Sequence, residues 1–362
     1  MSDFEFIPPQ RAQRVSFAVE PAYNGLASLL LITADLSGFG PWVQDTASAL
    51  SPEQLRTNCL VCDAAAAHLD GVAWPSFPAW VDDIAARDPL IMRQRSLVLL
   101  LEKLQMELEL APDDMPSAGE LLADRAAYLS LMERAYLQKG ESFDADYYDR
   151  GHDLLQDPVV RKDLIVGHLR QMWDEHLARA WDRNLPLIQE SAAALGSIDY
   201  SGRPAREIVR QVTARDDIPR AWENWLAEAE DLIFIPSPHI GPYLALIDLT
   251  GTTARIVLGA RVPQGTAMVS PALSRSELLT HLGTLADDTR LRILELLAHE
   301  GELSAQQVIA RLEISQSSSS RHLRQLVATG YVAERRQEGA KVYSLNPGRM
   351  ENMLGDLQRF LR

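Results

Sequence analysis

The chain has 362 residues, of which 46% are hydrophobic and 23% charged, and its formal net charge is −15. This length is enough for two or three domains that each bury a core, and the composition is that of a globular chain. Two Cys residues exclude a disulfide framework and fit a reducing compartment. No apolar run reaches the ~20 residues of a membrane span, and the opening MSDFEFIPP is acidic, so we expect a cytoplasmic protein without membrane contact.

The charge is unevenly distributed along the chain. Residues 1–270 carry 23 Lys and Arg against 39 Asp and Glu, whereas residues 271–362 carry 12 against 11. A negative total charge argues against nucleic acid as a partner, but binding depends on the local surface. Residues 311–341 contain six basic and three acidic residues, so an anionic partner is expected at the C-terminal end of the chain.

The first 265 residues show mainly helical patterns. Alternation predicts an edge strand over 14–19, and an apolar helix follows over 22–31. Start signals and helical periodicity then predict helices over 51–69, 89–110, 117–137, 157–180 and 203–214. Strands are expected near 232–235, 243–249 and 255–258, with Gly251 in a turn, before a linker at 262–265. We therefore predict a mainly α fold in which a large helical α+β domain, residues 1–265 with strands near 14–19 and 232–259, serves regulation or dimerisation.

Several features of this region have a functional and a structural interpretation. Cys59 and Cys62 are three apart and share a helix face, where they either bind a soft metal or pack as small apolar side chains; packing is the preferred interpretation. His168 and His176 are more than two helical turns apart, so a surface helix is preferred to a metal site. The acidic, aromatic stretch 144–153 either receives a cation or is a solvated face. Trp173, Trp181, Trp222 and Trp225 are spaced for core packing, with an aromatic ligand as the alternative.

No catalytic motif such as GxSxG, HExxH, a P-loop or a dinucleotide fingerprint is present, so we expect no enzyme and no cofactor.

Residues 286–347 contain three helical patterns followed by two strand patterns. The first has an apolar stripe through Leu285, Ile293, Leu294 and Leu297 and leaves Arg290 on another face. Ser304 with Gln307 predicts a capping box for the second helix, and Ser315 caps the third, which ends at Gly330. This order predicts a winged helix-turn-helix over residues 271–347, which is a DNA-binding unit.

The outward face of the third helix is polar and basic. It contains Ser315, Gln316, Ser317, Ser318, Ser320, Arg321, His322 and Arg324. Small polar side chains let a helix enter the major groove, where Gln and Ser bond base edges, and Arg pairs with phosphate or guanine. His322 either donates to a phosphate or packs beside the helix, and the residue pattern leaves both roles open.

Two strand-like segments, 331–336 and 341–345, flank a turn that contains Gly339 and form a basic hairpin with Arg335, Arg336 and Lys341. Alone, the serine run is interpreted as a solvated or disordered patch and the hairpin as an ordinary one. Together, the two capped helices, the basic face and the basic hairpin favour an interface with double-stranded DNA.

The motifs Thr289-Arg290-Leu291 and Ser320-Arg321-His322-Leu323 occur in order at the spacing of the ArsR family of bacterial winged-helix repressors. The chain resembles this family over about its last quarter. It departs from the family at Ser319, where many members have a branched apolar residue, so looser local packing is expected. No Cys follows Cys62 and no His occurs in residues 348–362, so the resemblance implies a member without the usual metal site.

Asn346 and Pro347 predict a last helix, residues 348–362, with an apolar stripe of Met350, Met353, Leu354, Leu357 and Leu361. The resemblance implies that terminal helices pair two subunits that read a two-fold symmetric operator. The alternative is that the stripe docks on the chain's own upstream domain.

The sequence therefore predicts a homodimeric, sequence-specific transcriptional regulator, a repressor, in which residues 1–265 add dimer contacts and bind a non-metal small-molecule effector. The principal alternative is a ligand-binding or enzymatic N-terminal domain that carries a DNA-binding module. A third possibility is a protein partner on the acidic helical face. The residues do not identify the operator, the effector or the sign of regulation.

Overall fold

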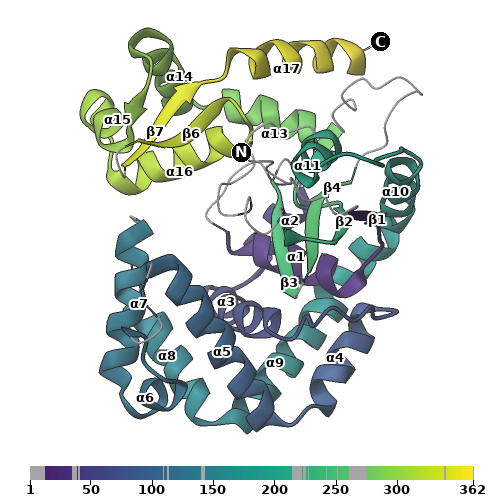
Figure 1. Ribbon diagram of the computed structural model, residues 1–362, viewed down its shortest axis with the longest axis vertical. Helices are drawn as coiled ribbons and strands as arrows, with labels where there is room; N and C mark the ends of the chain where they lie inside the picture. The colour runs from purple at the N-terminus through teal and green to yellow at the C-terminus, as the bar shows by residue number, and fades with distance from the viewer. Residues whose placement is uncertain are drawn as a thin grey trace, which may run out of the picture.

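The computed structural model describes residues 13–34, 39, 41–108, 110–111, 114–139, 143–213, 222, 226, 228–241, 243–250, 252–260, 275–337 and 340–361. A helix-rich N-terminal part with a four-stranded sheet lies below a C-terminal winged helix in Figure 1. The fold is mainly helical with few strands, as predicted. The expected linker at 262–265 and the turn residues Gly251 and Gly339 lie outside the described residues.

The N-terminal sheet joins segments from both ends of that part of the chain. Its strands are β1 (Arg14–Phe17), β2 (Asp231–Ser237), β3 (Ala245–Thr250) and β4 (Thr253–Gly259), in the order β1-β2-β4-β3. The pairs β1–β2 and β2–β4 are parallel, and β3 is antiparallel to β4. The predicted strand segments are confirmed, and β1 lies at an edge as its alternation indicated.

Strand alternation separates two cores. Leu232 and Phe234 of β2 face a cluster formed with α10 (Ala178–Gly196) and α11 (Ala205–Thr213). Ile233 and Ile235 face the opposite side, which is covered by α1 (Pro21–Ile32). Helix α1 is buried on nearly all sides, which fits its mostly apolar sequence.

Gly25 in α1 permits a close contact between helices. A Cβ atom at this position would lie 2.2 Å from Cδ2 of Phe77, a fully buried ring at the start of α4. A side chain at residue 25 would therefore push α1 away from α4.

The remaining helices of the N-terminal part form a helical lobe below the sheet in Figure 1, except the first of them, which lies beside α1 at the level of the sheet. They are α2 (Pro41–Ala49), α3 (Pro52–Ala66), α4 (Phe77–Ala86), α5 (Pro89–Leu108), α6 (Ala118–Ala123), α7 (Arg125–Lys139), α8 (Ala145–Gln156) and α9 (Pro158–Met172). Among the described residues, no helix is long and apolar enough to cross a membrane.

Two predicted helices differ from the structure, and the acidic stretch, for which no helix was predicted, is helical. The predicted helix 117–137 breaks at Asp124, because the Asp124 carboxylate accepts from the Ala127 amide at 3.0 Å and so begins a new helix. The predicted helix 157–180 continues to Gly196 through a π-helical turn, Trp173–Leu177. The acidic stretch near 144–153 forms α8, in which the Tyr147 hydroxyl donates to Asp63 at 2.7 Å.

The C-terminal part has winged-helix order. It contains α13 (Arg275–Leu285), α14 (Asp288–Glu300), β5 (Leu303–Ser304), α15 (Ala305–Leu312), α16 (Gln316–Ala328), β6 (Val332–Gln337), β7 (Ala340–Leu345) and α17 (Pro347–Phe360). The small sheet has the order β5-β7-β6. Leu285 belongs to α13 and not to the helix of Ile293, because Asp287 caps α14 by accepting from the Arg290 amide.

A candidate nucleic-acid interface

Local capping positions the two helices of the helix-turn-helix. Ser304 and Gln307 form the predicted capping box of α15. Glu313 turns the chain with a φ of 55°, and the Ser315 hydroxyl then accepts from the Ser318 amide at 3.2 Å to begin α16. These contacts involve only nearby residues, which is why the sequence predicted both helix starts.

Helix α16 has a packed face and an exposed face. Leu323 and Leu326 are buried in the winged-helix core. Of the predicted interface residues, Ser315, Gln316, Ser317, Arg321 and Arg324 are exposed, and Ser318 and Ser320 are half-buried. The polar amino-terminal end of α16 is therefore accessible from outside the chain.

His322 lies on the packed face of α16. Its side chain is buried, and its Nδ1 is 3.7 Å from Oδ1 of Asp287. Burial lowers the pKa of His322, with the Asp287 carboxylate opposing that effect. Of the two roles that the sequence left open, this placement fits packing and not donation to a phosphate.

Arg290 is buried and joins α14 to α16, whereas the sequence pattern assigned it to a face away from the core. Its Nη1 donates to Gln325 Oε1 at 2.9 Å, Nε to the Thr284 carbonyl at 2.6 Å and Nη2 to the Gly283 carbonyl at 2.9 Å. Gln325 Nε2 in turn donates to Thr284 Oγ1 at 3.2 Å. Burial lowers the pKa of Arg290, and the nearby Asp287 opposes this. Amphipathic periodicity treats Arg as a surface residue, so it does not reveal such an anchor; the Thr289-Arg290-Leu291 motif was the available signal.

Ser319 is fully buried in α16, at the position where looser packing was expected. Within the described residues its hydroxyl has no hydrogen-bond partner. A hydroxyl at a packed site thus replaces apolar contact with an unpaired polar group.

The basic groups of the wing have acidic neighbours. Arg335 on β6 forms an ion pair with Glu302, and Lys341 on β7 pairs with Glu334 at 2.9 Å. Both side chains remain exposed. The backbone of Arg336 belongs to β6, but its side chain lies outside the described residues.

Helix α17 packs partly on its own winged helix. Met353 is buried, and Met350 and Leu357 contact the same core. The other side of the stripe is open: Leu354 is 58% exposed and Leu361 74%. Phe360 of α17 and Leu279 of the neighbouring α13 are also exposed, which leaves an apolar surface on these two helices.

The upstream Cys and His residues do not gather into a metal site in the described part of the chain, where no group of three potential ligands is found. Cys62 is buried and donates to Asn58 Oδ1 at 3.6 Å, and Asn58 also contacts His168 Nε2 at 3.1 Å. Burial raises the pKa of both Cys59 and Cys62, which disfavours the thiolate that binds metal. The packed interpretation of these Cys residues agrees with this geometry.

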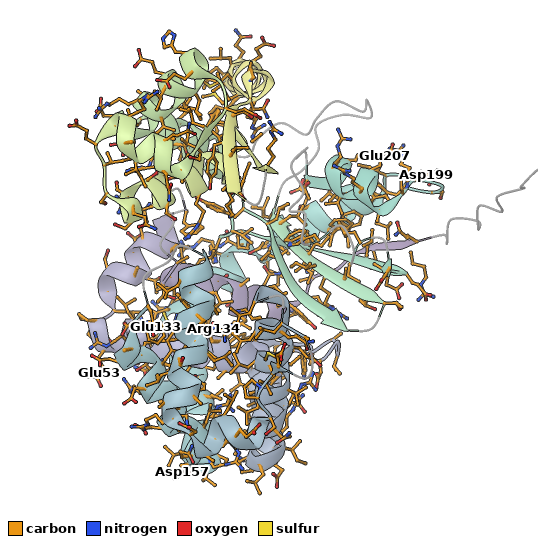
Figure 2. The ribbon with its side chains drawn as sticks, turned by 60° about the vertical axis from the view of Figure 1, so that its left-hand side comes forward. Glu53, Glu133, Arg134, Asp157, Asp199 and Glu207 are labelled. Atoms are coloured by element: carbon orange, nitrogen blue, oxygen red, sulfur yellow. The ribbon has the colours of Figure 1, made fainter. Side chains whose placement is uncertain are left out.

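The acidic surface lies upstream of the winged helix. In Figure 2 the labelled side chains of Glu53, Glu133, Asp157, Asp199 and Glu207 extend from the outside of the N-terminal part. All five are exposed. The charge division found in the sequence therefore corresponds to two parts of the structure.

Comparison with known proteins gives a family match at this interface. A helix-turn-helix domain model matches residues 285–335. An arsenic resistance transcriptional regulator of Pseudomonas putida is 46% identical over 63 residues, which are 17% of this chain and 49% of that protein. The arsenical resistance operon repressor of Staphylococcus aureus is 34% identical over 85 residues, 24% of this chain and 81% of that protein. The crystal structure of a possible transcriptional regulator for arsenical resistance is 29% identical in sequence and matches with a TM-score of 0.21. The match covers 23% of this chain and 84% of that chain.

The interface and fold define a winged helix-turn-helix regulator. The chain belongs to the ArsR family of transcriptional regulators. It spans about half the length of the two Pseudomonas putida relatives that it matches, 49% and 56%.

Proposed function

We propose that this protein is a DNA-binding transcriptional repressor that inserts α16 into the major groove. The observation that carries the proposal is the exposed amino-terminal turn of α16. Ser315, Gln316 and Ser317 offer hydrogen-bonding groups to base edges, with Ser318 and Ser320 at the margin. Arg321 and Arg324 project one to two turns further along and pair with phosphates or guanine. The proposal assigns His322 to packing within the winged helix.

The wing contacts the sugar-phosphate backbone of the DNA through Arg335, Arg336 and Lys341. Because Arg335 and Lys341 already pair with Glu302 and Glu334, they exchange partners when they bind phosphate. We therefore expect a smaller effect from the wing than from Arg321 and Arg324. The acidic upstream surface repels nonspecific DNA and raises selectivity for the operator.

The repressor acts as a homodimer through α13 and α17, whose exposed Leu279, Leu354, Phe360 and Leu361 cover one another across a two-fold axis. The dimer then presents two copies of α16 to half-sites about 34 Å apart, one turn of DNA. This arrangement predicts a two-fold symmetric operator in the cytoplasmic DNA.

The N-terminal part regulates DNA binding by taking up a non-metal effector, without catalysis. Cys59 is half-buried and Cys62 buried, and burial raises the pKa of both thiols, which supports a signal other than a thiophilic metal. An effector changes operator affinity only by its different affinities for the DNA-bound and free shapes.

Footprinting with the full-length protein on the DNA upstream of its own gene tests the proposal. The expected result is protection of two symmetric half-sites by a protein that sediments as a dimer. Arg292→Ala, at an exposed Arg of α14 outside the proposed interface residues, is the matched control and should protect the same region. Absence of any protected site at micromolar protein, together with a monomeric mass, would contradict both parts of the proposal.

A further inference from the structure

A group of polar side chains lies at the carboxyl ends of the parallel strands of the N-terminal sheet. Ser237 ends β2, and His239 follows two residues later. Asn24 and Ser28 are one turn apart on α1, which begins shortly after β1 ends. Ligands of sheets with parallel strands bind characteristically at this edge.

The hydrogen bonds fix the direction of each polar group. The Ser28 hydroxyl donates to the main-chain carbonyl of Asn24 at 2.8 Å, and in this arrangement its contact with His239 Nδ1 at 2.9 Å has Nδ1 as the donor. His239 Nε2 is consequently a lone-pair acceptor. The Asn24 amide nitrogen donates to the Pro236 carbonyl at 3.1 Å, which identifies its Oδ1 as a second acceptor.

These acceptors are buried and unpaired. Within the described part of the chain, His239 Nε2, Asn24 Oδ1 and Ser237 Oγ have no hydrogen-bond partner. The three residues are 5%, 1% and 1% exposed. Ser237 shares a strand face with Ile233 and Ile235, so its hydroxyl points to the side covered by α1, where Asn24 lies. Buried polar atoms are nearly always paired in folded proteins, so these three atoms offer hydrogen-bonding capacity to a further molecule.

One aromatic ring lies directly against His239, and a second aromatic pair belongs to the core cluster on the same side of the sheet. The Trp42 ring stacks on His239 with 4.2 Å between centroids and 13° between planes, and its Nε1 donates to the His176 carbonyl at 3.1 Å. Phe39 contacts Tyr243 with 5.1 Å between centroids. The surroundings thus combine hydrogen-bond acceptors with apolar ring faces, a combination typical of small-molecule sites.

We propose that Asn24, Ser237 and His239, with Trp42 beside them, bind a small uncharged molecule that carries N–H or O–H donors on one edge and a flat apolar face. Burial lowers the pKa of His239 to about 4, so its ring is neutral at physiological pH and neither attracts nor repels charge. A neutral donor-bearing ligand avoids the cost of burying an ion in this position.

The site is connected to the winged helix. In Figure 1 the carboxyl ends of β2 and β4 point toward the C-terminal part. Tyr243, four residues after His239, belongs to the core cluster against which Ala328 of α16 packs. Tyr243 also lies close enough to Arg290 to influence the pKa of its guanidinium. A ligand that shifts His239 and Tyr243 therefore acts on the anchor of α16; its role as effector rests on the proposed repressor function.

The test uses the full-length protein and two probes of nearly equal size, aniline, which has an N–H₂ group, and toluene, which does not. Binding is measured by saturation-transfer NMR without DNA, and the thermal midpoint is measured without probe. The variants are Ser237→Ala and, as the control, Ser130→Ala at an exposed position of α7. His239→Phe, which keeps a ring beside Trp42 but removes the acceptor, is the second test variant.

We expect aniline to bind the wild-type protein at least tenfold more tightly than toluene, and Ser237→Ala to weaken aniline binding at least fivefold. We also expect the thermal midpoint of Ser237→Ala to equal or exceed that of the wild type, because the hydroxyl has no partner in the free protein. Equal binding of the two probes, or unchanged aniline binding by both Ser237→Ala and His239→Phe, would overturn the proposal. A midpoint several degrees lower in Ser237→Ala than in Ser130→Ala would overturn it too, since the hydroxyl would then already have a structural partner such as a water.

Operator binding is measured separately on the same protein without a probe. Loss of operator binding there counts against the repressor function, while the NMR result decides the ligand site. If the protein binds both the operator and aniline, aniline should change operator affinity in the wild type and not in Ser237→Ala. No change in the wild type would overturn the connection to α16.

Discussion

The contact between Arg290 and Gln325 holds α16 against α14, and Gln325→Ala should release it. The substitution removes the acceptor of the Arg290 Nη1 hydrogen bond at 2.9 Å and the donor of the Thr284 Oγ1 contact at 3.2 Å. Gln325 is fully buried, so water does not replace it without rearrangement. The change therefore leaves Nη1 of a buried guanidinium without its hydrogen bond, with the Asp287 carboxylate 3.8 Å away.

The magnitude follows from the two contacts. A hydrogen bond to a charged group contributes about 1.5–3 kcal/mol and a neutral one about 1 kcal/mol. We expect Gln325→Ala to lower the free energy of unfolding of the winged helix by about 2.5–4 kcal/mol. Gln316→Ala, an exposed Gln on the same helix, is the matched control and should change it by less than about 0.5 kcal/mol.

The assay must separate the two parts of the chain. All seven Trp residues precede residue 226, so Trp fluorescence reports the N-terminal part, whereas far-ultraviolet circular dichroism reports helices in both. Urea unfolding of Gln325→Ala should show an early loss of helical signal before the change in Trp fluorescence. If the dichroism curves of Gln325→Ala and Gln316→Ala coincide, the anchoring role of Arg290 is refuted.

Three further predictions concern DNA, pH and metal. Arg321→Ala and Arg324→Ala should each weaken operator binding and reduce the slope of log affinity against log salt by about 0.9 per lost phosphate contact. Fluorescence anisotropy measures both quantities, with Arg292→Ala as the control. An unchanged slope in both variants would show that Arg321 and Arg324 do not contact the DNA. Burial lowers the pKa of His68 to about 3 and of His168 and His239 to about 4, below the ~6.5 of an unfolded chain, so stability is complete above about pH 6.5 and falls as the pH drops toward 4. For each of these His residues, the free energy of unfolding should fall by about 1.4 kcal/mol per pH unit in that window. Equal urea midpoints at pH 7 and pH 5 would contradict this. Zinc or arsenite should leave the operator complex intact in a gel-shift assay; metal-induced release that Cys59→Ser abolishes would show a thiolate sensor.

The winged helix was predictable because its signals are local. The caps at Ser304 and Ser315 act within three residues, and the apolar stripe containing Leu323 and Leu326 repeats at helical spacing. The exposed face of α16 followed from the same periodicity. His322 shows the limit of this reasoning, because a polar residue at the boundary of a helix face is assigned by its three-dimensional neighbours.

The N-terminal part was less predictable because its defining contacts are distant in sequence. The strand segments were found, but the parallel pairing of β1 with β2 joins Arg14 to Asp231 and has no local signal. The proposed ligand site combines α1 with the end of β2 and was equally invisible. Arg290 was misassigned because its burial depends on Gln325, which lies 35 residues away.

The pairing of β1 with β2 also bears on synthesis of the chain. Arg14 and Asp231 are 217 residues apart, so at about 5–20 residues per second the ribosome needs roughly 10–40 s to deliver the partner of the first strand. During that interval the apolar helix α1 has no sheet to cover it, and it is an expected binding site for chaperones on the nascent chain. The DNA-reading unit follows β4 in chain order, so it emerges after completion of the sheet on which the proposed regulation depends.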